Sequence, residues 1–276
     1  MPTLIRSERQ TLRAIQEHRL LRCRRAGAAY TQISTVGVVY HSERADASLN
    51  LVTPHQGVAW TRGEDLKQGF KLLERRGRTP RLEYLRGLFP EAFSRQLVLY
   101  GLQHEAEAAV WLYSPIQGPF PAGESPFGRP VENGYLEGFN VEEVNTQRTL
   151  GIWLRMFRSA AYGVDIPSVD VQTVEALQQE RVNGDSIFIL GYYHNTPIAA
   201  LQIVIGPKAA EIIEPAIIAP WSGMGFEEMM MAFAMQLLQM RNRETVYIVA
   251  NNDTIGSRYL RLGFIQITQV VTYVQV

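Results

Sequence analysis

The sequence has a single cysteine, Cys23, among its 276 residues. One thiol excludes an internal disulfide framework, and no cysteine or histidine pair has the spacing of a structural zinc site. Long apolar runs are also missing, because the strongest two, 186–193 and 229–238, are too short and too interrupted to span a bilayer. We therefore expect no metal site, no membrane-spanning segment and no membrane partner.

An excess of charge of either sign is absent as well, since 27 basic residues balance 27 acidic ones. A general nucleic-acid-binding surface needs a basic excess, so we expect no nucleic-acid partner. Arginines do gather in residues 6–25 at helical spacing, which favours the solvated face of an amphipathic helix over a phosphate or RNA patch. Arg6, Glu8 and Arg9 stand where a secretory signal needs an apolar stretch, which predicts a cytoplasmic protein.

The remaining composition, 46% hydrophobic and 20% charged residues, is that of a globular chain that can bury a sizeable core. Its clearest boundary is the segment SPIQGPFPAGESPFGRPVENG, which mixes proline, glycine and polar residues without an apolar period. We predict a domain over residues 1–113, a linker over 114–134 and a second domain over 135–276.

Hydrophobic periodicity predicts mixed α and β structure in both domains. In the first domain we expect strands over 30–40, 49–53, 81–85 and 106–113, and helices over 64–75 and 90–100. In the second we expect helices over 146–161, 169–181, 226–241 and 254–262, and strands over 187–193, 198–205, 211–218, 245–250 and 264–276. Residues 194–197 are expected to form a hairpin turn, and residues 264–276 to form one or two final strands broken near Val270.

A strand, a glycine-containing turn and a helix start follow one another in IIEPAIIAPWSGMGFEEMMMAF. Unpaired backbone N–H groups and the helix dipole both face an anion at such a turn. Gly223 and Gly225 would let the backbone approach a pyrophosphate closely. The pattern also fits an ordinary strand-to-helix turn, so by itself it leaves both interpretations open.

The segment NNDTIGSRYLRLGF resembles the end of the GNAT acetyltransferase core, where an asparagine opens a helix, a tyrosine follows seven residues later and Gly-Phe closes it. Asn252, Tyr259, Gly263 and Phe264 stand at these positions. Upstream, AEIIEPAI resembles the strand whose glutamate is the general base in the histone acetyltransferase branch, and Glu211 falls on that residue. The resemblance begins near residue 148 and extends to the end of the sequence.

The first domain resembles the same fold more faintly. RLEYLRGLFPEAFSRQLVLYGL has the pattern of a strand, a helix and a closing Gly-Leu, and no phosphate turn precedes it. The resemblance implies an α/β fold of two GNAT-like lobes in tandem, each a mixed, largely antiparallel sheet flanked by helices, with a degenerate first lobe that does not bind CoA. A helix that merely ends in glycine is the alternative for this half.

The resemblance further implies an N-acyltransferase that moves an acetyl or similar acyl group from CoA to an amine. In this role Glu211 would be the general base and Tyr259 the general acid. Glu214 is the other candidate base, on the opposite face of the strand unless a bulge intervenes, and the backbone N–H of Ile218 would stabilise the oxyanion. Each glutamate can equally be a solvated or ion-paired strand residue, and Tyr259 can equally be a core residue.

Acetyl-CoA, or another acyl-CoA, is the cofactor that the resemblance implies. Its expected contacts are Ile217, Ile218, Trp221, Ser222, Gly223, Met224, Gly225, Phe226, Asn252 and Tyr259. Two features depart from the family pattern: Pro220 stands where Gln or Arg is usual in a turn that looks shortened, and Glu227 and Glu228 would repel a pyrophosphate.

These departures keep a second interpretation open, a catalytically inactive GNAT-like module that binds a ligand or a protein. For the enzyme, the expected acceptor is a small-molecule or protein amine, which no portable motif identifies. A homodimer also stays open.

Overall fold

The computed structural model describes residues 6–55, 60–114, 138–243, 245–250 and 259–275. Within them the chain forms two compact units. Unit 1 comprises Met1–Val110, Ala250–Asn252 and Gln266–Val276, and unit 2 comprises Trp111–Val249 and Asp253–Ile265. Nearly all of the proline- and glycine-rich segment lies outside the described residues, so its role as a linker stays a prediction.

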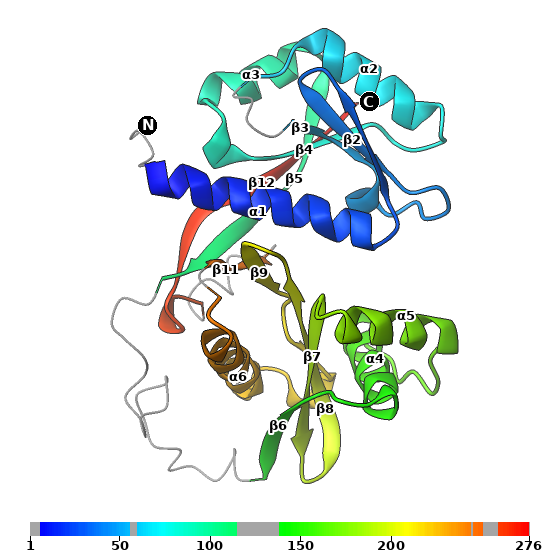
Figure 1. The fold of residues 1–276 in the computed structure, drawn as a ribbon, viewed down its shortest axis with the longest axis vertical. Coiled ribbons are helices and arrows are strands. Elements are labelled where there is room, and N and C mark those ends of the chain that lie inside the picture. The colour runs from blue at the N-terminus through cyan, green and yellow to red at the C-terminus, as the bar shows by residue number, and fades with distance from the viewer. Residues whose placement is uncertain (1–5, 56–59, 115–137, 244, 251–258, 276) are drawn as a thin grey trace. The chain divides into compact units, whose positions relative to one another are not determined.

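Unit 1 contains a sheet flanked by helices. Its elements are α1 Arg6–Arg25, β1 Ala29–Ile33, β2 Val36–Tyr40, β3 Leu51–Pro54, α2 Gly63–Glu74, β4 Arg81–Leu85, α3 Glu91–Leu99, most of β5 Leu102–Tyr113 and most of β12 Phe264–Gln275, with 3₁₀ turns at Ala47–Leu49 and Arg86–Leu88. The strand order is β1-β2-β3-β4-β12-β5. In Figure 1, α1 covers one face of these strands, and α2 and α3 cover the other.

The core of unit 1 follows from the helical periodicity. Leu66, Phe70 and Leu73 of α2 are four and three residues apart, so they share one face, and all three are buried. Leu12 and Ile15 of α1 are buried from the opposite side of the sheet. The predicted helices and strand 81–85 are therefore confirmed, and each helix faces the sheet with its apolar stripe.

The predicted single strand over 30–40 is wrong, because the segment forms the hairpin β1–β2. Its register pairs Ile33 with Val36 around a turn in which Ser34 has a positive φ of 47°. The turn is held from α2, where the Asp65 carboxylate accepts hydrogen bonds from the Thr35 hydroxyl at 2.6 Å and from its backbone N–H at 3.3 Å. A contact that is remote in sequence thus divides a run of strand-forming residues.

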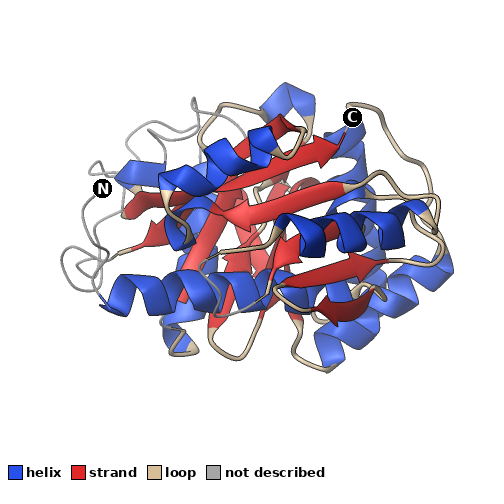
Figure 2. Cartoon of the chain, turned by 90° about the horizontal axis from the view of Figure 1, so that it is seen from above, coloured by secondary structure: helices blue, strands red, loops and turns tan. Residues whose placement is uncertain are grey.

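The strands of unit 2 also have helices on both faces. Its elements are β6 Phe139–Glu143, α4 Gln147–Tyr162, α5 Val171–Val182, β7 Ser186–Tyr193, β8 Thr196–Ile205, β9 Ala209–Ile212, β10 Ala216–Ile217, a 3₁₀ turn Ala219–Trp221, α6 Phe226–Met240 and β11 Thr245–Ala250. The strand order is β11-β9-β8-β7-β6, with β10 also on β8. Figure 1 shows α4 and α5 on one face of β7 and β8 and α6 on the other, and Figure 2 shows helices and strands from above.

Trp153 of α4 anchors the helical layer on the sheet of unit 2. Its indole packs on Phe157 and Phe188 with ring centroids 5.0 and 4.7 Å apart, and its Nε1–H donates to the Leu201 carbonyl at 2.9 Å. The buried indole therefore has a partner for its one polar group. Thr146 begins this helix as predicted, because its hydroxyl accepts the N–H of the third residue in a capping box.

Two strands predicted for the second domain differ from expectation. The segment 211–218 is two short strands, β9 and β10, separated by residues 213–215. The last segment is one continuous strand, β12, without the predicted break near Val270, which pairs with Leu85 of β4. Across the described ranges, no helix is long and apolar enough to cross a membrane.

Candidate functional site

A break in the strand after β9 positions the first acidic side chain of the site. On β8, Ile203 pairs with Ile212 and Ala200 pairs with Ala216, so residues 213–215 face only residues 201 and 202. The extra residue makes a bulge, and Pro215 has no N–H to donate to the ladder. Glu214 lies at this bulge and is exposed.

Glu211, the predicted general base, lies in different surroundings. It is only 3% exposed, and the Tyr247 hydroxyl donates a hydrogen bond to its Oε2 at 3.0 Å. Tyr247 is its direct neighbour on the parallel strand β11. Glu211 does not line the pocket described below, whereas Glu214 does.

The turn before α6 has the left-handed backbone that its glycines suggest. Gly223 has a φ of 78° and Gly225 a φ of 93°, and a Cβ on either would meet no atom within 4 Å. The glycines are needed for conformation, and the outer side of the turn is open. Gly225 is the N-cap of α6, where its carbonyl accepts the N–H of Met229 at 3.3 Å.

Donors of this turn already bind a carboxylate of the same chain. Glu227 Oε1 accepts the backbone N–H of Gly223 at 2.9 Å and the Ser222 hydroxyl at 3.3 Å. The donor set therefore fits an anionic oxygen, which is also what a phosphate presents. Sequence reasoning placed Glu227 near the turn but missed this bond, although its position four residues after Gly223 allows a helical side chain to reach back.

Most of the other residues predicted to contact a cofactor are buried or already hydrogen-bonded. Ile217 and Phe226 are buried, and the Phe226 ring packs on Phe139 at 4.5 Å, so only their backbones can serve a ligand. The N–H of Ile218, the predicted oxyanion donor, is occupied, because it donates to the Ile198 carbonyl at 3.1 Å. Trp221 is half-buried against Tyr193.

Two predicted residues remain. Met224 is 48% exposed at the tip of the turn. Asn252 lies outside the described residues.

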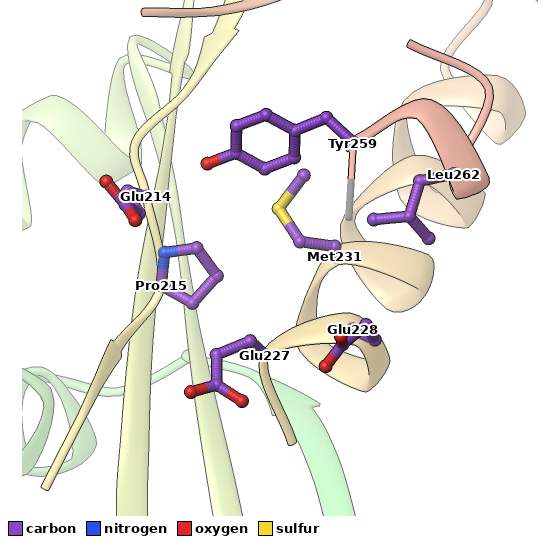
Figure 3. Close-up of a pocket in the computed structure, with 7 residues that line it drawn as sticks. All are labelled: Glu214, Pro215, Glu227, Glu228, Met231, Tyr259 and Leu262. Atoms are coloured by element: carbon purple, nitrogen blue, oxygen red, sulfur yellow. The ribbon is translucent and has the colours of Figure 1, made fainter. Parts of the chain in front are cut away.

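A pocket in unit 2 brings the turn, the bulge and the predicted general acid together (Figure 3). Its lining is Glu214, Pro215, Glu227, Glu228, Met231, Tyr259 and Leu262. In Figure 3 the phenol of Tyr259 points toward the strand segment that carries Glu214 and Pro215, beside the Met231 side chain. Three carboxylates and one phenol thus share a small pocket at the N-terminal end of α6.

Tyr259 is held by aromatic packing on its outer side. It is 2% exposed, and its ring lies 5.9 Å from both the Trp111 and the Phe264 rings. These contacts involve the ring, and the hydroxyl at its other end points toward the strand segment that carries Glu214 and Pro215. The predicted core role and the predicted catalytic role are therefore compatible in this one residue.

The negative charge of the pocket has a nearby counter-ion. Glu228 lies 3.7 Å from the Arg261 guanidinium, which is 65% exposed, so the pairing is weak. In the part of the chain that the structure describes, no three acidic, histidine or cysteine side chains are arranged to hold a metal ion. The three carboxylates of the lining favour a cationic group, such as an ammonium, over an anion.

No protein-family model matches the chain, and no curated protein matches it. Solved structures do match. A GCN5-related N-acetyltransferase from Kribbella flavida is similar over 96% of this chain and 95% of its own, with a TM-score of 0.69 and 15% identity.

Two further structures agree. A GCN5-related N-acetyltransferase from Sphaerobacter thermophilus is similar over 87% of this chain and 76% of its own, with a TM-score of 0.63 and 14% identity. A tandem GNAT protein from the clavulanic acid biosynthesis pathway covers 86% of this chain and 77% of its own, with a TM-score of 0.58 and 10% identity. At these identities the likeness is one of fold, and it confirms the predicted fold class: this chain has the mixed α/β fold of the GNAT superfamily.

Proposed function

We propose that this chain is an acyl-CoA-dependent N-acyltransferase with a tandem GNAT arrangement, in which unit 2 carries the reaction. The observation that supports this most is the convergence of Glu214 and Tyr259 on one pocket beside the glycine turn. The similarity of fold to N-acetyltransferases over nearly the whole chain supports the reaction class.

In this proposal Glu214 takes the role of base in place of Glu211. A base must reach the proton that it removes, and Glu214 lines the pocket, whereas Glu211 is buried on its strand with Tyr247 as a donor to its carboxylate. Glu211 then has a structural role in the sheet, because a buried carboxylate needs such a hydrogen bond.

The chain's residues account for every proton of the transfer. Glu214 accepts a proton from the ammonium of the acceptor, and the freed nitrogen attacks the thioester carbonyl carbon. The C–S bond breaks, Tyr259 donates a proton to the departing thiolate, and the second proton of the amine restores the phenol through water. One proton per turnover is released when Glu214 returns its proton to solvent.

The acceptor should be a primary amine that is cationic before reaction. Glu214, Glu227 and Glu228 place negative charge around the pocket, which favours an ammonium over a neutral or acidic molecule. Both a small polyamine and the amino group of a peptide have this chemistry. Acetyl is the simplest acyl group that such a small pocket would accept.

Thiol release measures the proposed reaction. The chain, supplied with about millimolar acetyl-CoA, a concentration at the upper end of ordinary KM values, is tested with polyamines, amino acids and peptides. Free CoA and an acceptor mass increased by one acetyl group are expected, with Glu214→Gln lowering turnover by about 10²-fold or more. If CoA binds but no amine is acylated, the enzyme proposal fails.

The second candidate is a GNAT-like module that binds a ligand or partner without catalysis. The Glu227 carboxylate on the turn favours it, because the turn's donors are occupied by the protein itself. This candidate predicts that the chain transfers no acyl group. It also predicts that Glu214→Gln and Tyr259→Phe leave the affinity for the partner unchanged.

A further inference from the structure

Glu227 is bound to the same turn that the proposed acyl donor would need. It is the second residue of α6, and its Oε1 accepts bonds from Gly223 and Ser222, which precede the helix. The two bonds, of 2.9 and 3.3 Å, hold the carboxylate against the backbone of the turn. A carboxylate oxygen and a phosphoryl oxygen are both anionic acceptors, and one N–H donates well to only one of them.

The surroundings of the turn leave room for an anion to replace the Glu227 carboxylate. The outer side is open at Gly223 and Gly225, and Ser222, Gly223 and Met224 are all exposed. Glu227 also lines the pocket, so a rotated side chain would move within a region already bordered by Glu214 and Tyr259. The occupied donors are therefore accessible to an incoming anion.

We propose that Glu227 is an intramolecular competitor of the acyl donor, so that CoA binds only when this carboxylate leaves the turn. The inference rests on the proposed function. Two effects act in the same direction: the carboxylate must give up its hydrogen bonds to Gly223 and Ser222, and its charge repels a pyrophosphate that takes its place. The acyl donor is then held weakly, and Glu227 sets its affinity.

Calorimetric titration with CoA of the full chain and three variants tests this competition. Glu227→Ala removes both the acceptor and the charge, and should bind CoA about 10–100-fold more tightly than the unaltered chain, the range of ordinary coupling free energies. Glu227→Gln keeps an oxygen that can accept the Gly223 N–H but loses the charge, so its affinity should be intermediate. Thermal melts confirm that each variant is folded.

Glu228→Gln is the matched control. It removes one negative charge from the same helical turn and the same pocket, where Glu228 lies near Arg261. General charge repulsion alone would make it equal to Glu227→Gln. Competition at the turn predicts a much smaller gain for the control, about threefold or less, since the donors of Gly223 and Ser222 go to Glu227 and Glu228 already faces the Arg261 guanidinium.

The possible results separate this inference from the proposed function. If CoA binding is measurable but equal in the unaltered chain and in both Glu227 variants, the competition is refuted while the acyltransferase stands. If the Glu227 variants bind more tightly and no protein acylates an amine, the competition is supported and the enzyme proposal fails. If no protein binds CoA even at millimolar concentration, both are overturned.

Discussion

At the residue scale, two glutamates three positions apart in one segment have opposite environments. Glu211 is buried on a central strand, where Tyr247 donates to its carboxylate, and Glu214 stands on a bulge at the edge of a pocket. A buried carboxylate that loses a donor costs about 1–3 kcal/mol, so the Tyr247 bond stabilises the fold. Of the two, Glu214 is the one that lines the pocket.

Tyr259→Phe tests the proposed acid. The change removes one hydroxyl and keeps the ring contacts with Trp111 and Phe264, so the free energy of unfolding should fall by about 1 kcal/mol or less. The turnover number should fall by about tenfold to hundredfold, and KM for acetyl-CoA should change little. Steady-state kinetics and urea unfolding measure the two effects. Unchanged turnover with a large loss of stability would make Tyr259 a core residue alone.

Gly225→Ala tests the backbone of the turn. Gly225 has a φ of 93°, which a residue with a Cβ adopts at a cost, and the free energy of unfolding should fall by about 1–2 kcal/mol. Gly151→Ala is the control, because Gly151 lies within α4 with open space around its Cα, and alanine there should stabilise the helix by about 0.5–1 kcal/mol. Equal effects at the two positions would contradict the left-handed turn.

At the element scale, the strands of unit 2 place the site. The β7–β8 hairpin turns on two residues, His194 and Asn195, both with positive φ, so Thr196 begins the next strand earlier than the predicted four-residue turn implied. Further along β8, the pairings Ile203–Ile212 with β9 and Ala200–Ala216 with β10 leave three residues opposite two, which is the bulge at Glu214. The position of Glu214 in the pocket therefore depends on the pairing of three strands.

The pairing of β6 with β7 carries a pH-dependent contact. Burial and the neighbouring Glu142 carboxylate, which accepts the Tyr192 hydrogen bond, raise the pKa of Tyr192 to about 12. The unfolded chain loses this proton near pH 10, before the folded chain does, so the contribution to stability is present below pH 10 and is lost as the pH rises toward 12. The unfolding free energy should fall more steeply over this window than in Tyr192→Phe. Parallel urea titrations at pH 8–12 compare them, and identical slopes would exclude the contact.

At the scale of the whole molecule, the last strand of the chain is part of unit 1, together with the first residues. β12 lies between β4 and β5 in the sheet of unit 1, and its Val271 and Tyr273 are buried there. We predicted this segment as the end of the second domain. Instead, Gln266–Val276 belongs with the first residues of the chain, so unit 1 is not continuous in sequence.

A chain that ends at Ile265 tests this arrangement. Without β12, the facing edges of β4 and β5 lose their partner, and we expect unit 1 to lose its protection against amide hydrogen exchange in β2, β3 and α2. Exchange followed by mass spectrometry measures this loss peptide by peptide. Gln275→Ala, at the exposed end of β12, is the control and should keep full protection. A truncated chain with unaltered protection in unit 1 would contradict the strand order.

The sequence by itself determined the elements that depend on neighbouring residues. Helices such as Gly63–Glu74, the strand Arg81–Leu85, the glycine turn and the α/β class follow from periodicity and turn chemistry, which act over a few residues. The resemblance at Tyr259 pointed to the right fold for the same reason, since its motif is a short run. The tertiary structure alone decided that Glu214 rather than Glu211 lines the pocket, that Glu227 binds the turn and that β12 pairs with β4. These outcomes depend on strand register and on contacts between distant segments, which no local pattern specifies.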